Sequence, residues 1–136
     1  MFDQISIVDP RVSELCNKTS EPSPYAILLT CLQKNYGLGD TSIKTDLTPA
    51  RNRKNRFTMQ VSEKVVEVIC RNKRDGKQMA SQKLLQQLHP NISSWGALLK
   101  MYGSRAISAQ KNKKERESEV RVAFLSHECM NFHLYP

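Results

Sequence analysis

The sequence predicts an α+β domain in which a helix is followed by three strands, a second helix and an additional C-terminal helix. Two patterns support this order. Apolar residues recur at helical spacing in three segments, near residues 24–35, 76–88 and 95–102. Between the first two segments, Thr, Ile, Val and Phe are frequent in three short runs that alternate partly between apolar and polar residues.

The length of the chain, 136 residues, suits one domain with flanking segments. We assign residues 23–103 to this domain, residues 1–22 to a partly docked linker, and residues 104–136 to a charged, flexible tail. No apolar run approaches the roughly 20 residues that a membrane span requires. We therefore expect a soluble chain and no insertion into a membrane.

The first helix is expected to begin at Ser23-Pro24, because serine caps helices well and proline fits the first helical turn. Tyr25 and Leu28 then start an apolar face at helical spacing. Gly37 can adopt the left-handed conformation that ends many helices, so we expect the helix to end near Asn35.

Three strands are predicted from Thr41 to Leu47, from Arg56 to Val61 and from Lys64 to Cys70, in an antiparallel meander. A tight turn around Ser62 and Glu63 is expected to join the second and third strands. The first connection, TPARNRKN, is long and basic. It predicts a mobile cationic loop at one end of the sheet.

The second helix is predicted from about Gly76, with an apolar face formed by Ala80, Leu84, Leu85 and Leu88. Lys77 and Gln78 then lie in its first turn, directly after Lys73 and Arg74. Unpaired backbone N–H groups and the helix dipole favour negative charge at such a position. The segment therefore predicts a phosphate site, and the alternative is a solvated basic helix cap.

An additional helix is predicted after His89-Pro90, with an apolar stripe formed by Trp95, Leu98, Leu99 and Tyr102. Gly103 is expected to end it. Because exposure of such a stripe would invite aggregation, we expect the helix to pack on the domain or on the linker around residues 5–15.

Charge is concentrated in one part of the chain. The 21 Lys and Arg residues exceed the 13 Asp and Glu residues and give a net charge of +8. Between Ala50 and Lys83 there are 10 basic and 3 acidic residues, a balance of +7. This concentration favours a polyanionic partner, either nucleic acid or an acidic membrane surface.

The cysteines and histidines do not predict an enzyme, a metal site or a cofactor. The four cysteines are widely spaced, so we expect no disulfides and a reducing compartment, with Cys31 and Cys70 as small core residues. His127, Cys129 and His133 form only part of a metal-ligand set. No nucleophile motif or carboxylate pair accompanies the histidines.

The predicted order of elements, with cations on the first loop and at the start of the second helix, resembles the double-stranded-RNA-binding domain. Three runs make the resemblance specific: SPYAILLTCLQKNYGLGDTSIK, NKRDGKQMASQKLLQQLHP and SWGALLKMYG. Together with their flanks, from about Asp9 to Gly103, they resemble the second such domain of the Pasha family. This family partners the ribonuclease III Drosha in the Microprocessor complex. The resemblance implies a nuclear subunit that recognises primary microRNA hairpins.

The resemblance also implies which residues contact RNA. The usual KKxAK motif at the start of the second helix is here KQMAS, residues 77–81, so only the first lysine and the alanine match. The implied contacts come from three segments. The second helix and the residues just before it contribute Lys73, Arg74, Lys77, Gln78 and Ser81. The first loop contributes Arg51, Arg53 and Lys54, and the first helix contributes Thr30, Gln33 and Lys34. The last three are expected to point outward. Such a surface recognises A-form shape over about 16 base pairs.

The sequence is therefore compatible with two functions. The first is a non-catalytic module that binds double-stranded RNA beside a Drosha-like ribonuclease III. The alternative, which the changed KQMAS motif supports, is a protein-interaction domain of the same fold with weak or lost RNA binding. The KNKKER run at residues 111–116 suits either a nuclear-import sequence or a solvated charged tail.

Overall fold

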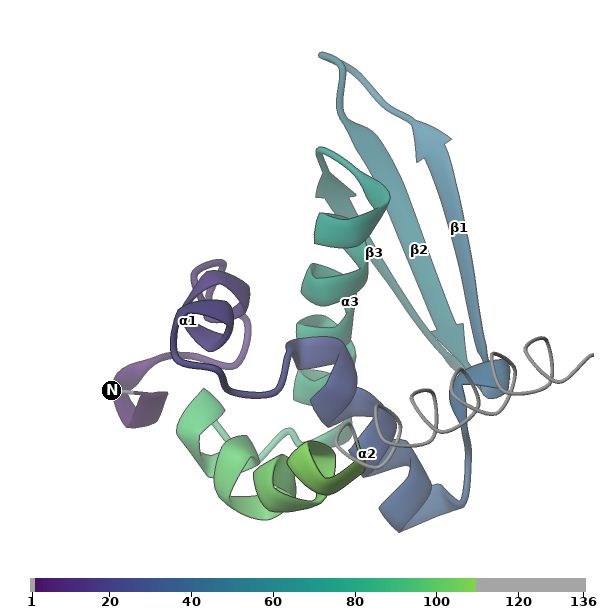
Figure 1. Cartoon of the computed structure of the whole chain (residues 1–136). Helices are drawn as coiled ribbons and strands as arrows, with labels where there is room; N and C mark the ends of the chain where they lie inside the picture. The colour runs from purple at the N-terminus through teal and green to yellow at the C-terminus, as the bar shows by residue number, and fades with distance from the viewer. Residues whose placement is uncertain (1, 110–136) are drawn as a thin grey trace, which may run out of the picture. The chain divides into compact units, whose positions relative to one another are not determined.

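The computed structural model describes residues 2–109. Its elements, in chain order, are η1 (Phe2–Gln4), α1 (Val12–Lys18), α2 (Pro24–Tyr36), η2 (Asp40–Ser42), β1 (Ile43–Pro49), β2 (Asn55–Val61), β3 (Lys64–Cys70), α3 (Lys73–Leu88) and an unlabelled helix at residues 95–109 (Figure 1). The predicted fold class is confirmed: this is the α-β-β-β-α layout of the double-stranded-RNA-binding domain with an additional C-terminal helix. The predictions for residues 110–136, including the partial metal set and the KNKKER run, lie outside the described residues.

Helix α2 begins and ends as the sequence predicts. The Ser23 hydroxyl oxygen accepts a hydrogen bond from the Ala26 amide, and Pro24 occupies the first turn. Gly37 ends the helix with a left-handed φ of 66°. The local sequence therefore determines both ends of this helix.

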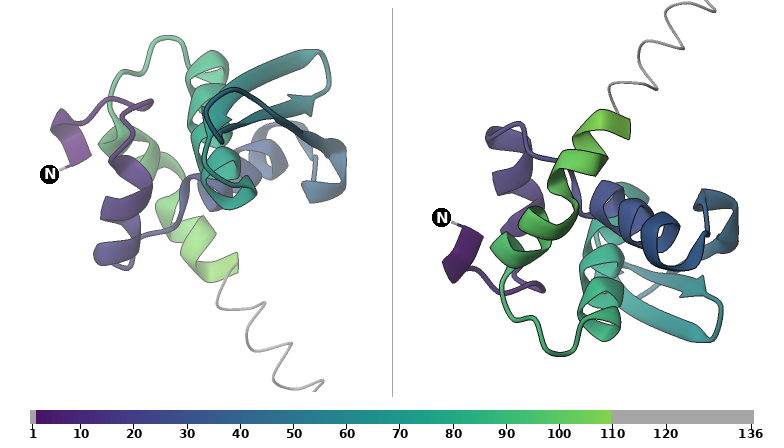
Figure 2. Two further views of the ribbon diagram at one scale, coloured as in Figure 1. Left: turned by 90° about the horizontal axis from the view of Figure 1, so that it is seen from above. Right: turned by 90° about the horizontal axis from the view of Figure 1, so that it is seen from below.

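The three strands form an antiparallel sheet in the order β1-β2-β3, in which Phe57 lies between Leu47 and Val68. Helix α3 covers one face of β2 and β3, where Phe57 and Met59 are fully buried (Figures 1 and 2). Along β1 only Ile43 is partly buried. The predicted tight turn at Ser62 and Glu63 is confirmed, since Val61 pairs with Lys64.

The prediction of a long loop between β1 and β2 is wrong. Both strands extend beyond their predicted ends, and the Ala50 amide donates to the Lys54 carbonyl at 2.8 Å. The Lys54 amide in turn donates to the Arg51 carbonyl at 3.2 Å. Asn52 and Arg53, at the centre, have φ values of 60° and 61°, as a type I′ hairpin turn requires. The basic residues therefore lie on a short hairpin.

Helix α3 begins at Lys73, earlier than Gly76, because Asn72 caps it: the Asn72 side-chain oxygen accepts from the Asp75 amide at 2.9 Å. Lys73 and Arg74 therefore lie in the first turn, and Lys77 lies one turn further along. Gly76 allows the helix to approach the sheet. A Cβ at this position would lie 2.7 Å from both Phe57 Cβ and Cys70 Sγ.

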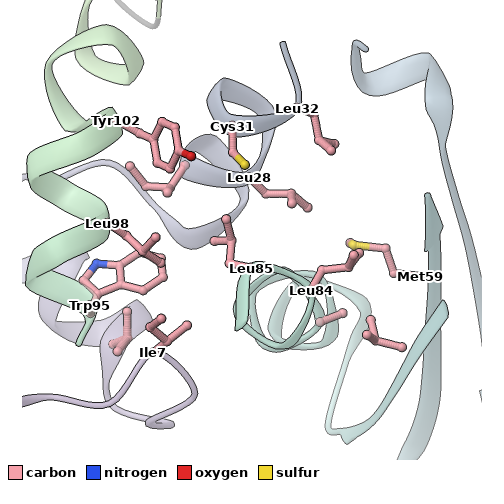
Figure 3. Packing of buried hydrophobic residues seen from close by; sticks show 14 of the residues in the cluster. Ile7, Leu28, Cys31, Leu32, Met59, Leu84, Leu85, Trp95, Leu98 and Tyr102 are labelled. Atoms are coloured by element: carbon pink, nitrogen blue, oxygen red, sulfur yellow. The ribbon is translucent and has the colours of Figure 1, made fainter. Parts of the chain in front are cut away.

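The additional helix packs as predicted, on the core and on the N-terminal segment. Trp95, Leu98 and Tyr102 belong to the same buried cluster as Ile7, which lies beside the Trp95 ring (Figure 3). The Trp95 amide donates to the Ile5 carbonyl at 2.8 Å, so backbone hydrogen bonds reinforce the apolar contact.

Gly103 does not end this helix, which continues to residue 109. Gly37 is the one glycine with positive φ among residues 2–109, so Gly103 lacks the left-handed conformation of a helix stop. Ala106 is 1% exposed and extends the apolar stripe by one turn. Burial therefore outweighs the preference of glycine for helix ends.

Helix α1 was not predicted, because Pro10 and Pro22 interrupt the pattern around it. Its residues Val12 and Cys16 are buried. Gln82 of α3, itself 2% exposed, connects this segment to the domain. Its amide nitrogen donates to the carbonyl oxygens of Ile7 at 2.9 Å and Asp9 at 2.8 Å. A buried amide with two acceptors fixes the path of the chain before α1.

Cys31 and Cys70 are buried free thiols, as predicted, and Cys16 is a third. Burial raises the pKa of the Cys16 thiol to about 11 and also raises the pKa values of Cys31 and Cys70. These thiols are therefore protonated, unreactive core residues. Within residues 2–109, no helix is long and apolar enough to cross a membrane.

Candidate nucleic-acid interface

The sheet topology brings the β1–β2 hairpin and the start of α3 to one end of the molecule. Asn55, the first residue of β2, pairs with Cys70, the last residue of β3, and α3 begins soon afterwards. The side-chain amide nitrogen of Asn55 also donates to the Arg71 carbonyl at 3.0 Å. Both segments lie at the top of Figure 1. Two basic segments that are separate in sequence are thus neighbours.

Six predicted contact residues gather there, and we call them the cationic end: Arg51, Arg53, Lys54, Lys73, Arg74 and Lys77. The first five are exposed and Lys77 is half-buried. In the described part of the chain, none of the six lies in an ion pair. Their neighbours differ, since Arg56 pairs with Glu67 at 2.9 Å and Arg71 with Asp75 at 3.4 Å. Among residues 2–109, no carboxylate therefore competes with an external anion for these six positive charges.

Lys77 is held in place by an aromatic ring from another helix. Its Nζ lies 3.8 Å from the centroid of the Tyr25 ring, well within the range of a cation–π interaction. The ring covers one side of the ammonium group and leaves its other N–H donors available. The sequence pattern places Tyr25 only on the apolar face of its helix. No spacing rule predicts this pairing, because 52 positions separate the two residues.

Gln78 connects the same two helices. Its side-chain oxygen accepts a hydrogen bond from the Tyr25 amide at 3.0 Å, one of the N–H groups that the first turn of α2 leaves unpaired. Gln78 occupies the place of a lysine in the usual motif. In this chain the position therefore stabilises the junction between α2 and α3.

Thr30 and Ser81 do not reach the surface, so the outward placement predicted for Thr30 is wrong. Thr30 is 5% exposed and donates its hydroxyl to the Ala26 carbonyl at 2.9 Å. Ser81 is 0% exposed and donates to the Lys77 carbonyl at 2.7 Å. Both hydroxyls are satisfied within their own helices. Neither is accessible to a phosphate.

Gln33 and Lys34 are exposed, but they lie near the C-terminal end of α2. More than two helical turns separate them from Tyr25. Lys34 Nζ lies 5.6 Å from the Tyr102 ring of the additional helix. The structure therefore does not bring these two residues into the cationic end.

The start of α3 attracts anions mainly through its side chains. The Asp75 amide is already bonded to Asn72, and the Asp75 carboxylate adds a negative charge in the first turn. Fewer free N–H groups remain than the sequence led us to expect. Lys73 and Arg74 supply the attraction instead.

Two further features of the described residues concern metal ligation and a histidine network at the C-terminal end of α3. Within residues 2–109 no three His, Cys, Asp or Glu side chains lie close enough together to hold a metal ion. His89 has a structural role, because its Nε2 lies 2.7 Å from the Tyr102 hydroxyl oxygen. The Asn35 side-chain amide donates a hydrogen bond to the same oxygen at 2.9 Å. Burial raises the pKa of Tyr102 to about 12. This network supports the core, and in it the Asn35 side-chain amide also donates to the Cys31 sulfur at 3.5 Å.

An apolar groove of about 440 Å³ lies at the opposite end of the sheet, beside the β2–β3 turn. Its apolar walls come from the ends of α2 and α3 and from the start of the turn: Leu32, Tyr36, Leu38, Val61, Leu84 and Leu88. Lys64 lies at its edge. The two ends of the sheet therefore differ in chemistry.

Comparison with known proteins supports the resemblance inferred from the sequence. No family model matches the chain. The Microprocessor complex subunit DGCR8 of Bos taurus is 46% identical to it over 121 residues. The chain is similar to part of a Microprocessor subunit. The match covers 89% of the chain but 16% of DGCR8. Because DGCR8 is a Pasha homologue, the predicted resemblance is confirmed.

Proposed function

We propose that the chain is a non-catalytic module that binds double-stranded RNA through its cationic end. The observation that carries this proposal is the convergence of six cations, which form no ion pair within residues 2–109, from a short hairpin and a helix start on one end of this fold. Neutralising phosphates with such residues releases counterions, which supplies most of the affinity for duplex RNA.

The two parts of the cationic end suit different features of an A-form helix. A hairpin tip can enter the wide, shallow minor groove, and cations on the first turns of a helix can contact phosphates across the neighbouring major groove. Such contacts distinguish duplex from single strand by shape. We therefore expect little dependence on base sequence.

We further propose that the RNA is a primary microRNA hairpin and that the chain acts in the nucleus beside a Drosha-like ribonuclease III. The support is the similarity to the Microprocessor complex subunit DGCR8. The match covers 16% of DGCR8, so the chain is similar to a small part of that protein. We therefore propose RNA binding as the contribution of this chain to the larger role.

A mobility-shift assay tests the first step. The chain is titrated against a hairpin RNA and against single-stranded DNA with the same number of phosphates, at several salt concentrations. We expect preference for the hairpin at every concentration and affinity that falls steeply with salt. Equal affinity for the two would contradict duplex recognition.

A pull-down with Drosha tests the second step. The full chain is compared with a chain that ends at residue 109, because Ala106 is buried and truncation at residue 104 would expose the core. Nuclease capture that is insensitive to RNase treatment would support direct contact. Capture by the full chain alone would assign the contact to residues 110–136.

The second candidate is a protein-interaction domain with weak RNA binding. It is favoured by the internal contacts of Gln78 and Ser81, which replace two lysines of the usual motif, and by the apolar groove at the opposite end. This candidate becomes the better one if the chain shows no preference for duplex RNA.

A further inference from the structure

We propose that Thr48 is a phosphorylation site for a proline-directed, basophilic protein kinase, and that its phosphate weakens the cationic end. The consequence for binding rests on the proposed function, whereas the modification itself does not. Two Ser/Thr-Pro dipeptides occur in the chain, Ser23-Pro24 and Thr48-Pro49. The two dipeptides differ in their exposure and in the residues that follow them.

Thr48 meets the requirements of a kinase substrate. It is exposed near the end of β1, an edge strand whose residues 44–49 are all exposed and which pairs with β2 alone. The segment is already extended, the form in which kinases bind peptides. Pro49 follows directly, and Arg51, three positions after the threonine, supplies the basic residue that such kinases prefer.

Ser23 shares the following proline but lacks the exposure and the basic residue. Its hydroxyl oxygen accepts from the Ala26 amide at 3.2 Å and caps α2, and the residue is half-buried. The third residue after it is Ala26, which offers no charge. Ser23 is therefore a matched internal control with the same dipeptide.

The reaction needs ATP as the phosphoryl donor. The Thr48 hydroxyl oxygen bonds to the γ-phosphorus as the bond from that phosphorus to ADP breaks. The hydroxyl proton passes to the base of the kinase. The product is a phosphothreonine ester that carries a charge of about −2 near neutral pH.

The position of this charge explains its effect. Thr48 lies directly opposite Arg56 in the sheet, so both side chains point to the face that α3 does not cover. A phosphate there can compete with Glu67 for the Arg56 guanidinium, which Glu67 now contacts at 2.9 Å. It also adds negative charge at the base of the hairpin that carries Arg51, Arg53 and Lys54. The modified hairpin repels the RNA backbone.

The test begins with phosphate incorporation into the full chain, which is treated with ATP and a cyclin-dependent kinase and measured by intact mass and peptide mapping. We expect one phosphate, on Thr48, in the parent and in Ser23→Ala, none in Thr48→Ala, and slower incorporation in Arg51→Ala. A chain without phosphate on Thr48 would overturn the proposal.

The phosphorylated and unmodified chains are then compared in the hairpin-RNA titration. We expect affinity to fall about tenfold or more, and the slope of log K against log salt to flatten by about two units. Kinase-treated Thr48→Ala should bind like untreated Thr48→Ala. Equal binding by the phosphorylated and unmodified chains would overturn the proposed effect. If the unmodified chain itself fails to bind RNA, the proposed function fails, and phosphate incorporation still decides whether Thr48 is a substrate.

Discussion

The two sides of this domain use their side chains in opposite ways. The terminal seam, where residues 2–18 pack against the helix that begins at Trp95, buries apolar groups and joins its two segments by backbone hydrogen bonds. Gln82 at the seam is 2% exposed and donates two hydrogen bonds. The cationic end has charged groups that form no ion pair with any other described residue, and it keeps a non-glycine residue, Arg53, at a φ of 61°.

The seam therefore contributes mainly to the stability of the fold, and the cationic end contributes mainly to binding. Burial and satisfied hydrogen bonds lower the free energy of the folded state, whereas unpaired like charges and a strained turn raise it. Functional sites commonly retain such unfavourable features. Substitutions at the seam should therefore change the free energy of unfolding, and substitutions at the cationic end should mainly change RNA affinity.

The largest effect is expected for Trp95→Ala. The Trp95 side chain is 0% exposed and contacts the core beside Ile7, so its removal leaves a large cavity. We expect the free energy of unfolding to fall by about 3 to 5 kcal/mol in chemical denaturation. Met101→Ala, on the exposed side of the same helix, should change it by less than about 0.5 kcal/mol. Similar losses in the two variants would show that the seam does not depend on Trp95.

Prediction from sequence succeeded where local chemistry decides the structure. Ser23, Pro24 and Gly37 determine the ends of α2 through capping and a left-handed residue, whatever surrounds them. It failed where tertiary packing decides. Gly103 lies inside a helix because Ala106 is buried beyond it, and α1 forms beside prolines because Val12 and Cys16 pack into the seam.

The second effect is expected for Lys77→Ala, at the cationic end. Because Lys77 keeps free N–H donors beyond the Tyr25 ring, we expect it to contact a phosphate. Its loss should weaken RNA binding by about 1 to 3 kcal/mol, equally for different duplex sequences. The slope of log K against log salt should flatten by about one unit.

Lys64→Ala is the matched control, since it removes the same charge at the opposite end of the sheet. Lys64→Ala should change the RNA affinity and the salt slope much less than Lys77→Ala does. If Lys77→Ala and Lys64→Ala weaken binding equally, the interaction depends on net charge, and the cationic end is not a specific site.

The third effect concerns the strained hairpin. A left-handed conformation costs a non-glycine residue roughly 1 to 2 kcal/mol, and Asn-Gly is the preferred pair for this type of turn. Arg53→Gly should therefore raise the free energy of unfolding by about 1 kcal/mol. Arg53→Ala keeps the Cβ and should not stabilise the domain.

Both Arg53 variants lose the same charge, so they should bind hairpin RNA with the same reduced affinity. Parallel denaturation and RNA titrations measure the two properties separately. Stronger RNA binding by Arg53→Gly than by Arg53→Ala would mean that the turn conformation, and not the charge, limits binding.

Only part of the site could be predicted from sequence. Charge density identified the cationic end, because Lys and Arg residues that cluster in sequence remained together in space. The inward positions of Thr30 and Ser81 could not be predicted, because burial depends on how each helix is rotated against the core. The contact between Tyr25 and Lys77 depends on the packing of α2 against α3, which no local pattern specifies.

The smallest effect is expected for Tyr25→Leu, which tests whether that contact prepares Lys77 for RNA. The ring restricts the lysine before binding, so its loss should weaken RNA binding by about 0.5 to 1 kcal/mol, the lower part of the range for a cation–π pair. Tyr25→Phe keeps the ring and should bind like the parent.

Because Leu also alters packing, both variants are compared in the Lys77→Ala background. There the difference between Leu and Phe should vanish, since no ammonium remains to be positioned. A persistent difference would assign the effect of Tyr25 to the packing of α2 against α3.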